Sequence, residues 1–213
     1  DSVMSTGVFP MELWEKYGIA GYNIASYGNT LPITYWALQN ALDYAKPKLV
    51  VLDVQGVSKS YKLSGNSSDV HTAFDCYPIT KTKVEALDDL MDDPDAVDDD
   101  GVAYADMKWE YLFTLGKYHA RWSELTDADF HPVYNKEKGA KSVVAVADIG
   151  DYDLIDENMA TEESGQTGFV YLRRIIEDCQ ARGIEVLLVH LPYPANEQQQ
   201  MDANAVWAVA EDY

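Results

Sequence analysis

The sequence has few cysteines, few basic residues and no long apolar run, and each absence excludes a class of protein. Only two cysteines are present, Cys76 and Cys179, which excludes a multi-disulfide scaffold and a cysteine-based zinc site. The sequence fits either one disulfide between them or two free thiols. No segment reaches the roughly 18 consecutive apolar residues of a membrane-spanning helix, so we expect no direct membrane insertion by these residues.

Positive charge is scarce as well. Sixteen Lys and Arg residues stand against 36 Asp and Glu residues, which gives a formal net charge of −20. Binding to a phosphate backbone or to an anionic membrane surface needs a basic face, so we expect no nucleic-acid partner. Hydrophobic residues make up 47% of the 213 residues. That content is sufficient for the core of one globular domain.

Short apolar segments alternate with helical patterns along the chain. Continuous apolar runs are typical of parallel strands that are covered on both faces, and amphipathic helices between them are typical of an α/β fold. We therefore expect strands at Gly21–Ser26, Lys48–Val54 and Ile184–Leu191, and helices at Leu31–Ala45, Thr167–Arg182 and Glu197–Asp212.

The segment 58–164 interrupts this alternation. It contains the acidic run "DDLMDDPDAVDDDG", which stands between helical patterns at 79–90 and 104–115. We expect a large, mostly helical insertion that packs beside the sheet and caps its functional edge. The acidic run lacks the glycine and the terminal glutamate of an EF-hand loop. A solvated surface loop is therefore the favoured interpretation, and no metal site is predicted.

Polar residues follow the expected strands at the points where ligands bind in open α/β sheets. Asn29 follows the first of these strands, Gln55 the second, and His190 stands at the end of the third. The chain also opens with "DSVMSTGVFP", which fits a loop before a helix or the turn that carries a nucleophilic serine. A hydroxyl, a glycine turn and amide side chains at one edge are the parts of an acyl-transfer site.

Three motifs occur in a fixed order: "DSVMSTG", "NIASYGNT" and "KPKLVVLDV". Together they resemble the SGNH (GDSL-type) hydrolase superfamily. The stretches "YHARWSELT" and "LLVHLPYPA" look similar to its bacterial branch related to extracytoplasmic acyl-transfer proteins. The resemblance implies a flavodoxin-like three-layer α/β/α fold over residues 1–213. It also implies that the superfamily's first strand precedes this segment and its last strand follows it.

The resemblance assigns roles to individual residues. Ser2 would be the nucleophile, and its backbone N–H would join that of Gly28 in the oxyanion hole. Val57 stands where the superfamily has a third donor, an asparagine, so Asn29 or Gln55 would supply that amide instead. No Asp-x-x-His motif occurs in the sequence. The catalytic histidine is therefore expected beyond residue 213, and His190 is the candidate within the chain.

Other polar and aromatic residues are candidates for the substrate cleft, and most of them have a structural interpretation too. His71 could form a surface pair with Asp75, four residues later on a helix. Arg121 suits a sugar or carboxylate ligand, and it equally suits a salt bridge to Glu124 or Asp127. The cleft candidates are Asp1, His71, His119, Arg121 and Trp122.

The expected function is that of a serine-dependent esterase or O-acyltransferase without a cofactor. The resemblance implies an acyl ester or a cell-surface glycan as substrate, a membrane-bound acyltransferase as partner, and an extracytoplasmic location with an anchor outside this segment. One alternative is a catalytically inactive carbohydrate-binding or scaffold module of the same fold, which Val57 favours. Another is a flavodoxin-like nucleotide binder, but "STG" at 5–7 is a poor phosphate loop.

Overall fold

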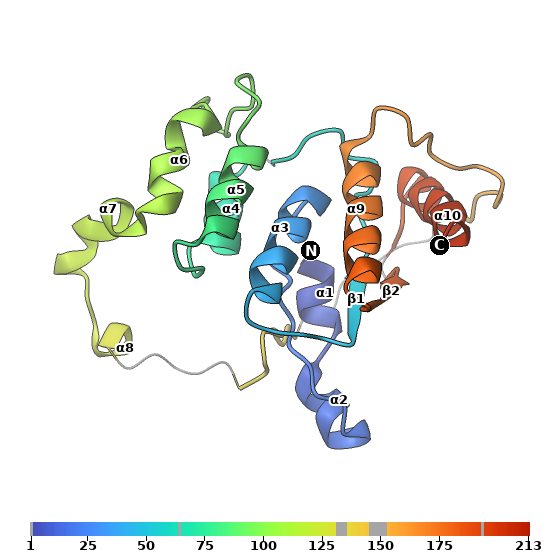
Figure 1. Cartoon of the computed structure of the whole chain (residues 1–213), viewed down its shortest axis with the longest axis horizontal. Coiled ribbons are helices and arrows are strands. Elements are labelled where there is room, and N and C mark those ends of the chain that lie inside the picture. The colour runs from blue at the N-terminus through green and yellow to red at the C-terminus, as the bar shows by residue number, and fades with distance from the viewer. Residues whose placement is uncertain (1, 64, 131–135, 145–152, 193) are drawn as a thin grey trace.

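The computed structural model describes residues 2–63, 65–130, 136–144, 153–192 and 194–213 (Figure 1). The described residues form a mixed α/β structure with two strands, β1 (Leu49–Asp53) and β2 (Glu185–Val189). The helices are α1 (Ser2–Gly7), α2 (Pro10–Tyr17), α3 (Leu31–Leu42), α4 (Ser67–Phe74), α5 (Lys81–Leu90), α6 (Tyr104–Leu112), α7 (Thr114–Tyr118), α8 (Asp127–Phe130), α9 (Thr167–Ala181) and α10 (Glu197–Glu211), with a 3₁₀ turn η1 (His119–Ser123).

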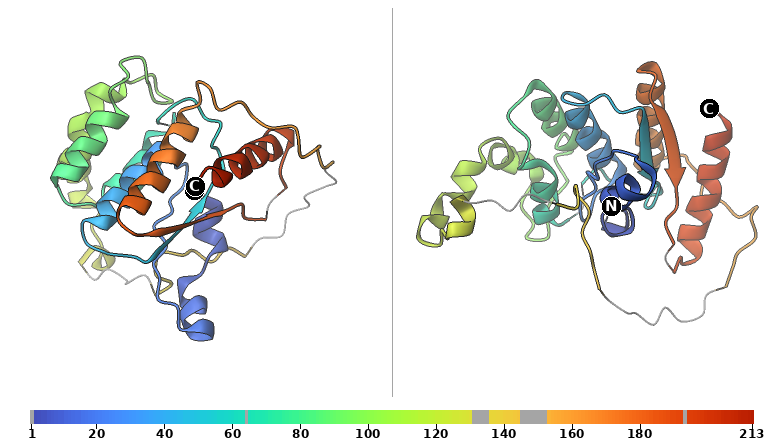
Figure 2. Two further views of the ribbon diagram at one scale, coloured as in Figure 1. Left: turned by 45° about the vertical axis from the view of Figure 1, so that its right-hand side comes forward. Right: turned by 90° about the horizontal axis from the view of Figure 1, so that it is seen from below.

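The two strands pair in parallel, as predicted. Leu49 lies opposite Glu185 and Asp53 opposite Val189. The Val54 N–H continues the ladder with a 3.2 Å hydrogen bond to the Val189 carbonyl. Helices α3 and α9 lie on one side of the strands and α10 on the other (Figure 2). The parallel α/β class is therefore confirmed for the described residues.

The main core lies between the strands and these three helices. Helix α9 contributes Leu172, Ile175, Ile176 and Cys179, all at most 4% exposed. Their spacing of three and four residues places them on one helical face, as the sequence pattern predicts. Burial of this face is the main stabilising term, at roughly 25 cal/mol per Å² of apolar surface.

The strand expected at Gly21–Ser26 is wrong. The segment is irregular, and the Asn23 N–H donates to the Lys138 carbonyl at 2.9 Å. The side-chain amide of Asn23 donates to the carbonyls of Met4 and Val8 at 2.9 and 3.0 Å. These bonds fix the segment against α1, and among the described residues no neighbouring strand offers it a ladder of backbone partners.

Several helix boundaries differ from the sequence pattern. The stretch at 2–7 is a helix rather than a loop. The helix expected to reach residue 45 ends at Leu42. The helix expected at 104–115 is interrupted at Phe113, where the backbone adopts φ −118° and ψ 68°, and α7 then begins at Thr114.

The described part of 58–164 contains the helices α4 to α8 and the turn η1, joined by irregular segments that make up more than half of it. Helices α4, α5 and α6 form a second core around Phe74, Leu87, Tyr104 and Tyr111, into which Ile33 of α3 packs. Helices α7 and α8 extend away from this core (Figure 1). Helix α3 therefore contributes side chains to both cores, to the main core on the side of the sheet and to the second core on the side of the helical insertion.

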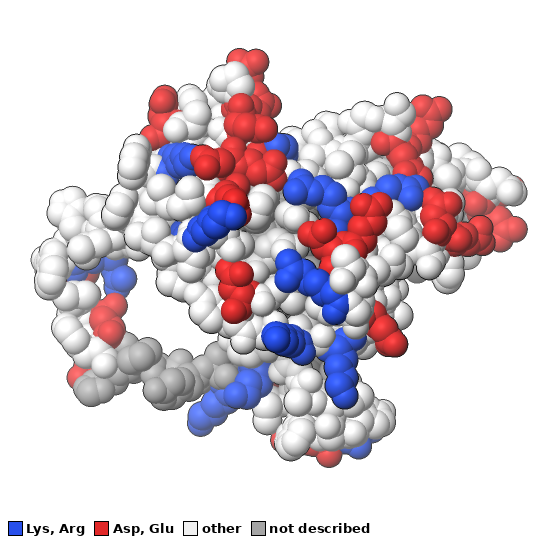
Figure 3. Space-filling view, in the orientation of Figure 1, with Lys and Arg blue, Asp and Glu red and all other residues white. Residues whose placement is uncertain are grey.

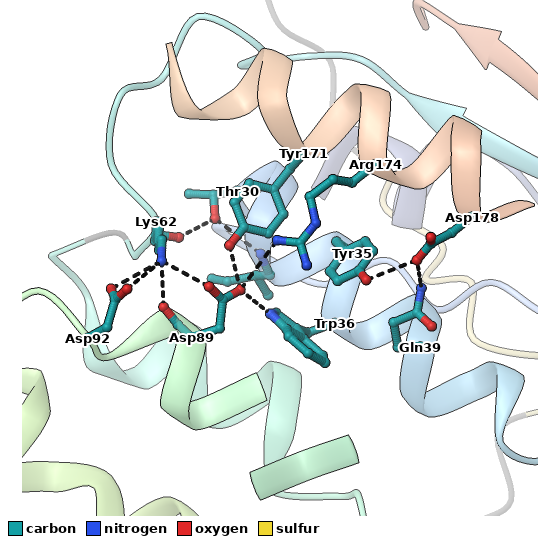
Figure 4. Close-up of polar contacts among 11 residues, drawn as sticks. Thr30, Tyr35, Trp36, Gln39, Lys62, Asp89, Asp92, Tyr171, Arg174 and Asp178 are labelled. Carbon is teal, nitrogen blue, oxygen red and sulfur yellow. Dashed lines mark hydrogen bonds and ion pairs between the residues drawn. The ribbon is translucent and has the colours of Figure 1, made fainter. Parts of the chain in front are cut away.

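A partly buried polar network around Asp89 connects the two cores (Figure 4). Asp89 Oδ2 accepts hydrogen bonds from Trp36 Nε1 of α3, at 2.6 Å, and from the hydroxyl of Tyr171 of α9. Asp89 Oδ1 pairs with Lys62 Nζ at 2.9 Å. Arg174 stacks on the ring of Tyr171, with its guanidinium carbon 4.7 Å from the ring centre. One carboxylate of α5 thus joins α3 and α9.

The surface charge is uneven on the face in Figure 3. Acidic side chains gather above α5 and α6 and beside α10, while Lys and Arg side chains lie between them over α3 and α9. The acidic run is partly structural rather than only solvated. Asp98 is 8% exposed, and its carboxylate accepts the N–H groups of Asp100 and Val102. None of the described helices is both long and apolar enough to cross a bilayer.

We predict that Asp89→Asn lowers the free energy of unfolding by about 1–3 kcal/mol, because an amide has one acceptor atom where the carboxylate has two. Burial raises the pKa of Asp89, but the hydrogen bonds from Tyr171, Trp36 and Lys62 lower it by more. A lowered pKa stabilises the fold above the unfolded value of about 3.9, and this stabilisation is lost as the pH falls.

Urea unfolding at pH 7 and at pH 3 measures this difference. The control is Asp92→Asn, because Asp92 also pairs with Lys62 but its side chain is 57% exposed. We expect the control to lose under about 1 kcal/mol. Equal losses in the two variants, or a loss for Asp89→Asn that persists unchanged at pH 3, would contradict the assigned role of Asp89.

Candidate functional site

A polar pocket of about 380 Å³ lies where the chain leaves β1 and enters α10. Four segments form it: the start of α1, the turn at 28–29, the loop at 55–59 and the first turn of α10. Its lining residues are Ser2, Gly28, Asn29, Gln55, Gly56, Ser58, Lys59, Asn196, Gln198, Gln199 and Asp202. The pocket brings together Ser2, Gly28, Asn29 and Gln55, all of which the sequence singled out.

Ser2 is the first residue of α1 and is partly exposed. Its carbonyl oxygen accepts hydrogen bonds from Ser5 Oγ at 2.8 Å and Thr6 Oγ1 at 3.0 Å. These two contacts lie within the same short helix and fix the backbone around Ser2. Ser2 lines the pocket at this first turn of α1.

Gly28 occupies a backbone conformation that suits glycine, with φ +64°. A side chain there would also overlap the carboxylate of Asp69 on α4. The sequence therefore needs glycine at this turn for two independent reasons. The close approach of α4 to Gly28 places the turn directly beside the pocket.

Buried polar atoms without a hydrogen-bond partner gather on the segments that reach the pocket. Asn29 is 7% exposed and Asp53 is 8% exposed. Asn29 Oδ1, Asp53 Oδ2 and Ser26 Oγ have no partner among the described residues. Burial raises the pKa of Asp53. Unsatisfied buried polar atoms cost about 1–3 kcal/mol each, and such atoms are characteristic of sites that hold ligands or water.

The loop at 55–59 is held from two sides. Ser58 Oγ donates to Asp202 Oδ2 of α10 at 2.7 Å, and the Gly168 N–H of α9 donates to the Lys59 carbonyl at 2.9 Å. Asp202 also accepts hydrogen bonds from Thr161 Oγ1 and Gln198 Nε2. The loop is thus held by α9 and by α10.

His190 does not line this pocket. It follows β2 and lies in a separate, larger groove of about 860 Å³ along β2 and α10, which includes Leu187, Val206 and Trp207. Burial lowers the pKa of His190, and the negative charge of Asp202 opposes that effect. The structure therefore places this histidine in an apolar groove and not among the residues that line the pocket with Ser2.

His71 pairs with Asp75, as predicted, through a 2.9 Å contact from Nδ1 to Oδ1. The expected surface position is wrong, because His71 is 4% exposed and stacks on Tyr111 at 3.9 Å between ring centres. Tyr118 donates to the other oxygen of Asp75 at 2.6 Å. His71 Nε2 is buried without a partner, and the residue does not line the pocket.

The remaining cleft candidates lie elsewhere. His119, Arg121 and Trp122 belong to η1, and none of them lines the pocket. Arg121 forms a salt bridge of 2.9 Å with Asp129, not with Glu124 or Asp127. Its partner is set by the turn that leads into α8, which the sequence spacing did not reveal. Asp1 lies outside the described residues.

Six lining residues were not predicted from the sequence, and they form two groups. The first group, Ser58 and Lys59, lies in the loop after β1, separated from Gly56 by Val57. The second group lies at the start of α10: Asn196, Gln198, Gln199 and Asp202. One signal could have found the second group. "NEQQQ" follows the expected strand at 184–191 within a few residues and forms a capping box, in which Asn196 and Gln199 exchange side-chain to backbone hydrogen bonds.

Metal and thiol chemistry have little support in the described part of the chain. It contains no group of three or more His, Cys, Asp or Glu side chains that could hold a metal ion. Cys179 is buried and Cys76 is exposed, and both are free thiols. Burial raises the pKa of each thiol, which disfavours the reactive thiolate form.

Comparison of the chain with protein-family models, curated proteins and solved structures finds no match.

We predict that Gly28→Ala destabilises the protein more than Gly18→Ala does. Both glycines have a positive φ, +64° and +68°, but only a side chain at Gly28 would meet another group. Gly18→Ala should cost about 1–2 kcal/mol through the backbone alone. Gly28→Ala should cost at least about 1 kcal/mol more, because Asp69 must move. Equal losses in urea unfolding would contradict the close contact with α4.

Proposed function

We propose that this chain is a serine-dependent acyl-transfer domain of the SGNH type, an esterase or O-acyltransferase that works through an acyl-serine. One observation carries the proposal. Ser2, Gly28, Asn29 and Gln55 come from three separate segments, yet all four line one polar pocket. The resemblance implies Ser2 and Gly28 as nucleophile and oxyanion donors, with Asn29 or Gln55 in place of the asparagine that this sequence lacks.

The chemistry would use the pocket as follows. Ser2 Oγ attacks the ester carbonyl carbon and gives its proton to a base, and the carbonyl oxygen becomes negatively charged. The N–H groups of Ser2 and Gly28 and an amide of Asn29 or Gln55 stabilise that oxygen. The bond to the alcohol then breaks, the alcohol takes up the proton, and the acyl group remains on Ser2. Water or a sugar hydroxyl completes the transfer.

The base is assigned to a residue outside the described part of the chain. None of the described histidines lines the pocket. The carboxylate of Asp202 accepts three hydrogen bonds, from Ser58, Thr161 and Gln198, so both of its oxygens are engaged in holding neighbouring segments. The proposal therefore gives Asp202 the role of holding the loop at 55–59.

The finer fold and the setting belong to the same proposal. A flavodoxin-like three-layer arrangement is supported by α3 and α9 on one side of the parallel strands and α10 on the other. The amide side chains around the pocket suit a substrate with several hydroxyl groups. We accordingly propose a glycan or another acyl ester as substrate, an extracytoplasmic setting, and a membrane-bound acyltransferase as donor.

One observation favours a second function, a binding module without catalysis. Val57 occupies the position of the superfamily's third oxyanion donor, and its side chain is fully buried in the main core. That position therefore supplies packing rather than a hydrogen bond. A site with one donor fewer would lose about 10²–10³ in rate.

Labelling with a fluorophosphonate probe tests the proposal. The test uses the full-length protein, so that the proposed base is present. We expect it to form one covalent adduct and its Ser2→Ala variant to form none, because the probe reacts with an activated serine hydroxyl. The matched control is Ser58→Ala, since Ser58 lines the same pocket but donates its hydroxyl to Asp202. The control should be labelled like the unmodified chain.

Two outcomes contradict the proposal. Undiminished labelling of Ser2→Ala would remove Ser2 as the nucleophile. Failure of the unmodified chain to react, in a sample that binds sugars in the pocket, would favour the binding module.

A further inference from the structure

Lys59 is the one lysine, arginine or histidine among the residues that line the pocket in the described part of the chain. Asp202 is the one carboxylate among them, and its oxygens are occupied by hydrogen bonds from Ser58, Thr161 and Gln198. The pocket therefore combines one cation and one hydrogen-bonded carboxylate with amide and hydroxyl groups. This composition differs from the chain as a whole, which has a formal charge of −20.

The backbone of Lys59 is fixed in place. Its N–H donates to the Gly56 carbonyl at 3.2 Å, and its carbonyl accepts the Gly168 N–H at 2.9 Å. The side chain runs close to Gly56, where a Cβ would lie 3.1 Å from Lys59 Cε and 3.5 Å from Nζ. The ammonium group therefore lies close to the turn at 56, which itself lines the pocket.

The ammonium group of Lys59 makes no ion pair with any described residue. Its one described contact is with the ring of Tyr61, 5.8 Å from Nζ to the ring centre. Lys62 and Arg173, by contrast, form ion pairs with Asp89 and Glu163. A cation that forms no ion pair at the wall of a pocket is available to a negatively charged ligand.

A second feature of the pocket is independent of Lys59. Asn29 lines the pocket, is more than nine-tenths buried, and has an Oδ1 atom without a partner. An unpartnered amide oxygen needs a hydrogen-bond donor, such as a hydroxyl group. The amides of Gln55 and Gln198 add further donors and acceptors around the same space. The pocket thus offers groups for hydroxyls as well as one for an anion.

We propose that Lys59 binds a carboxylate carried by the substrate, so that the pocket selects hydroxylated molecules with one negative charge over their neutral analogues. The term substrate rests on the proposed acyl-transfer function, whereas the binding itself does not. A monoanion fits better than a phosphate dianion, because a single ammonium group faces the pocket together with the negative charge of Asp202.

Equilibrium binding to the Ser2→Ala protein tests this without turnover. The first pair of ligands is methyl β-D-glucuronide and methyl β-D-glucoside, which differ in one carboxylate on a sugar. The second pair is monomethyl succinate and methyl butyrate, which differ in one carboxylate on an acyl chain. We expect the charged member of at least one pair to bind about tenfold more tightly, which corresponds to about 1.4 kcal/mol.

The lysine variants assign the preference to its source. Adding Lys59→Gln should abolish the tenfold preference, while Lys59→Arg should keep most of it. Lys46→Gln is the matched control, because Lys46 is exposed and does not line the pocket. The preference should also weaken as the salt concentration is raised from about 50 to about 500 mM, because salt screens the attraction between the ammonium group and the carboxylate.

The results separate this inference from the proposed function. Equal affinity within both pairs, no binding of any of the four ligands, or a preference that survives Lys59→Gln would overturn the role of Lys59. Fluorophosphonate labelling of Ser2 does not depend on these affinities. Labelling at Ser2 without a preference for carboxylates would support the proposed function and contradict this inference. A preference for carboxylates without labelling at Ser2 would support this inference and contradict the proposed function.

Discussion

The parallel pairing of β1 with β2 is the constraint on which the rest of the structure depends. Its register sets Asp53 opposite Val189, so both strands end at the same edge of the sheet. The loop at 55–59 leaves from that edge, and the chain that follows β2 enters α10 beside it. Antiparallel pairing would send these two segments to opposite ends. The pocket exists because the two strands run in the same direction.

Buried polar groups have two different roles in this molecule. Around Asp89 they are satisfied: the carboxylate receives hydrogen bonds from Trp36, Tyr171 and Lys62 and joins the insertion to the main core. Beside the pocket they are not, and Asn29 Oδ1 and Asp53 Oδ2 lack partners among the described residues. A satisfied network stabilises a unique arrangement, whereas unsatisfied buried groups are costly. Of the four such atoms among the described residues, His71 Nε2 lies in the helical insertion and the other three lie on segments that reach the pocket.

Much of the fold could be predicted from local patterns. The apolar runs at 49–53 and 185–189 and the helical face of α9 are visible in the sequence, because continuous burial leaves a continuous apolar signal. The segment at 21–26 contains only a short apolar signal and forms no strand. Asn23 instead bonds to α1 and to Lys138, more than a hundred residues away. Such long-range bonds leave no periodic signal.

The candidate site likewise contains residues that local sequence patterns reveal and contacts that they do not. Ser2, Gly28, Asn29 and Gln55 could be found because each follows an expected strand or belongs to an ordered motif. The contact of the loop at 55–59 with α10 could not, since the Ser58–Asp202 hydrogen bond joins residues 144 positions apart. The partner of an exposed arginine such as Arg121 could not be predicted either. Several acidic residues lie near Arg121 in the sequence, and the local turn places Asp129 within ion-pair distance.

The most direct measurement is a crystal structure of the chain after reaction with a small alkyl fluorophosphonate. The account predicts phosphorus bonded to Ser2 Oγ, with the phosphoryl oxygen within hydrogen-bond distance of the Gly28 N–H. That oxygen would occupy the place of the negatively charged carbonyl oxygen. Phosphorus on any other residue, or a phosphoryl oxygen that points away from the turn at 28–29, would contradict the account.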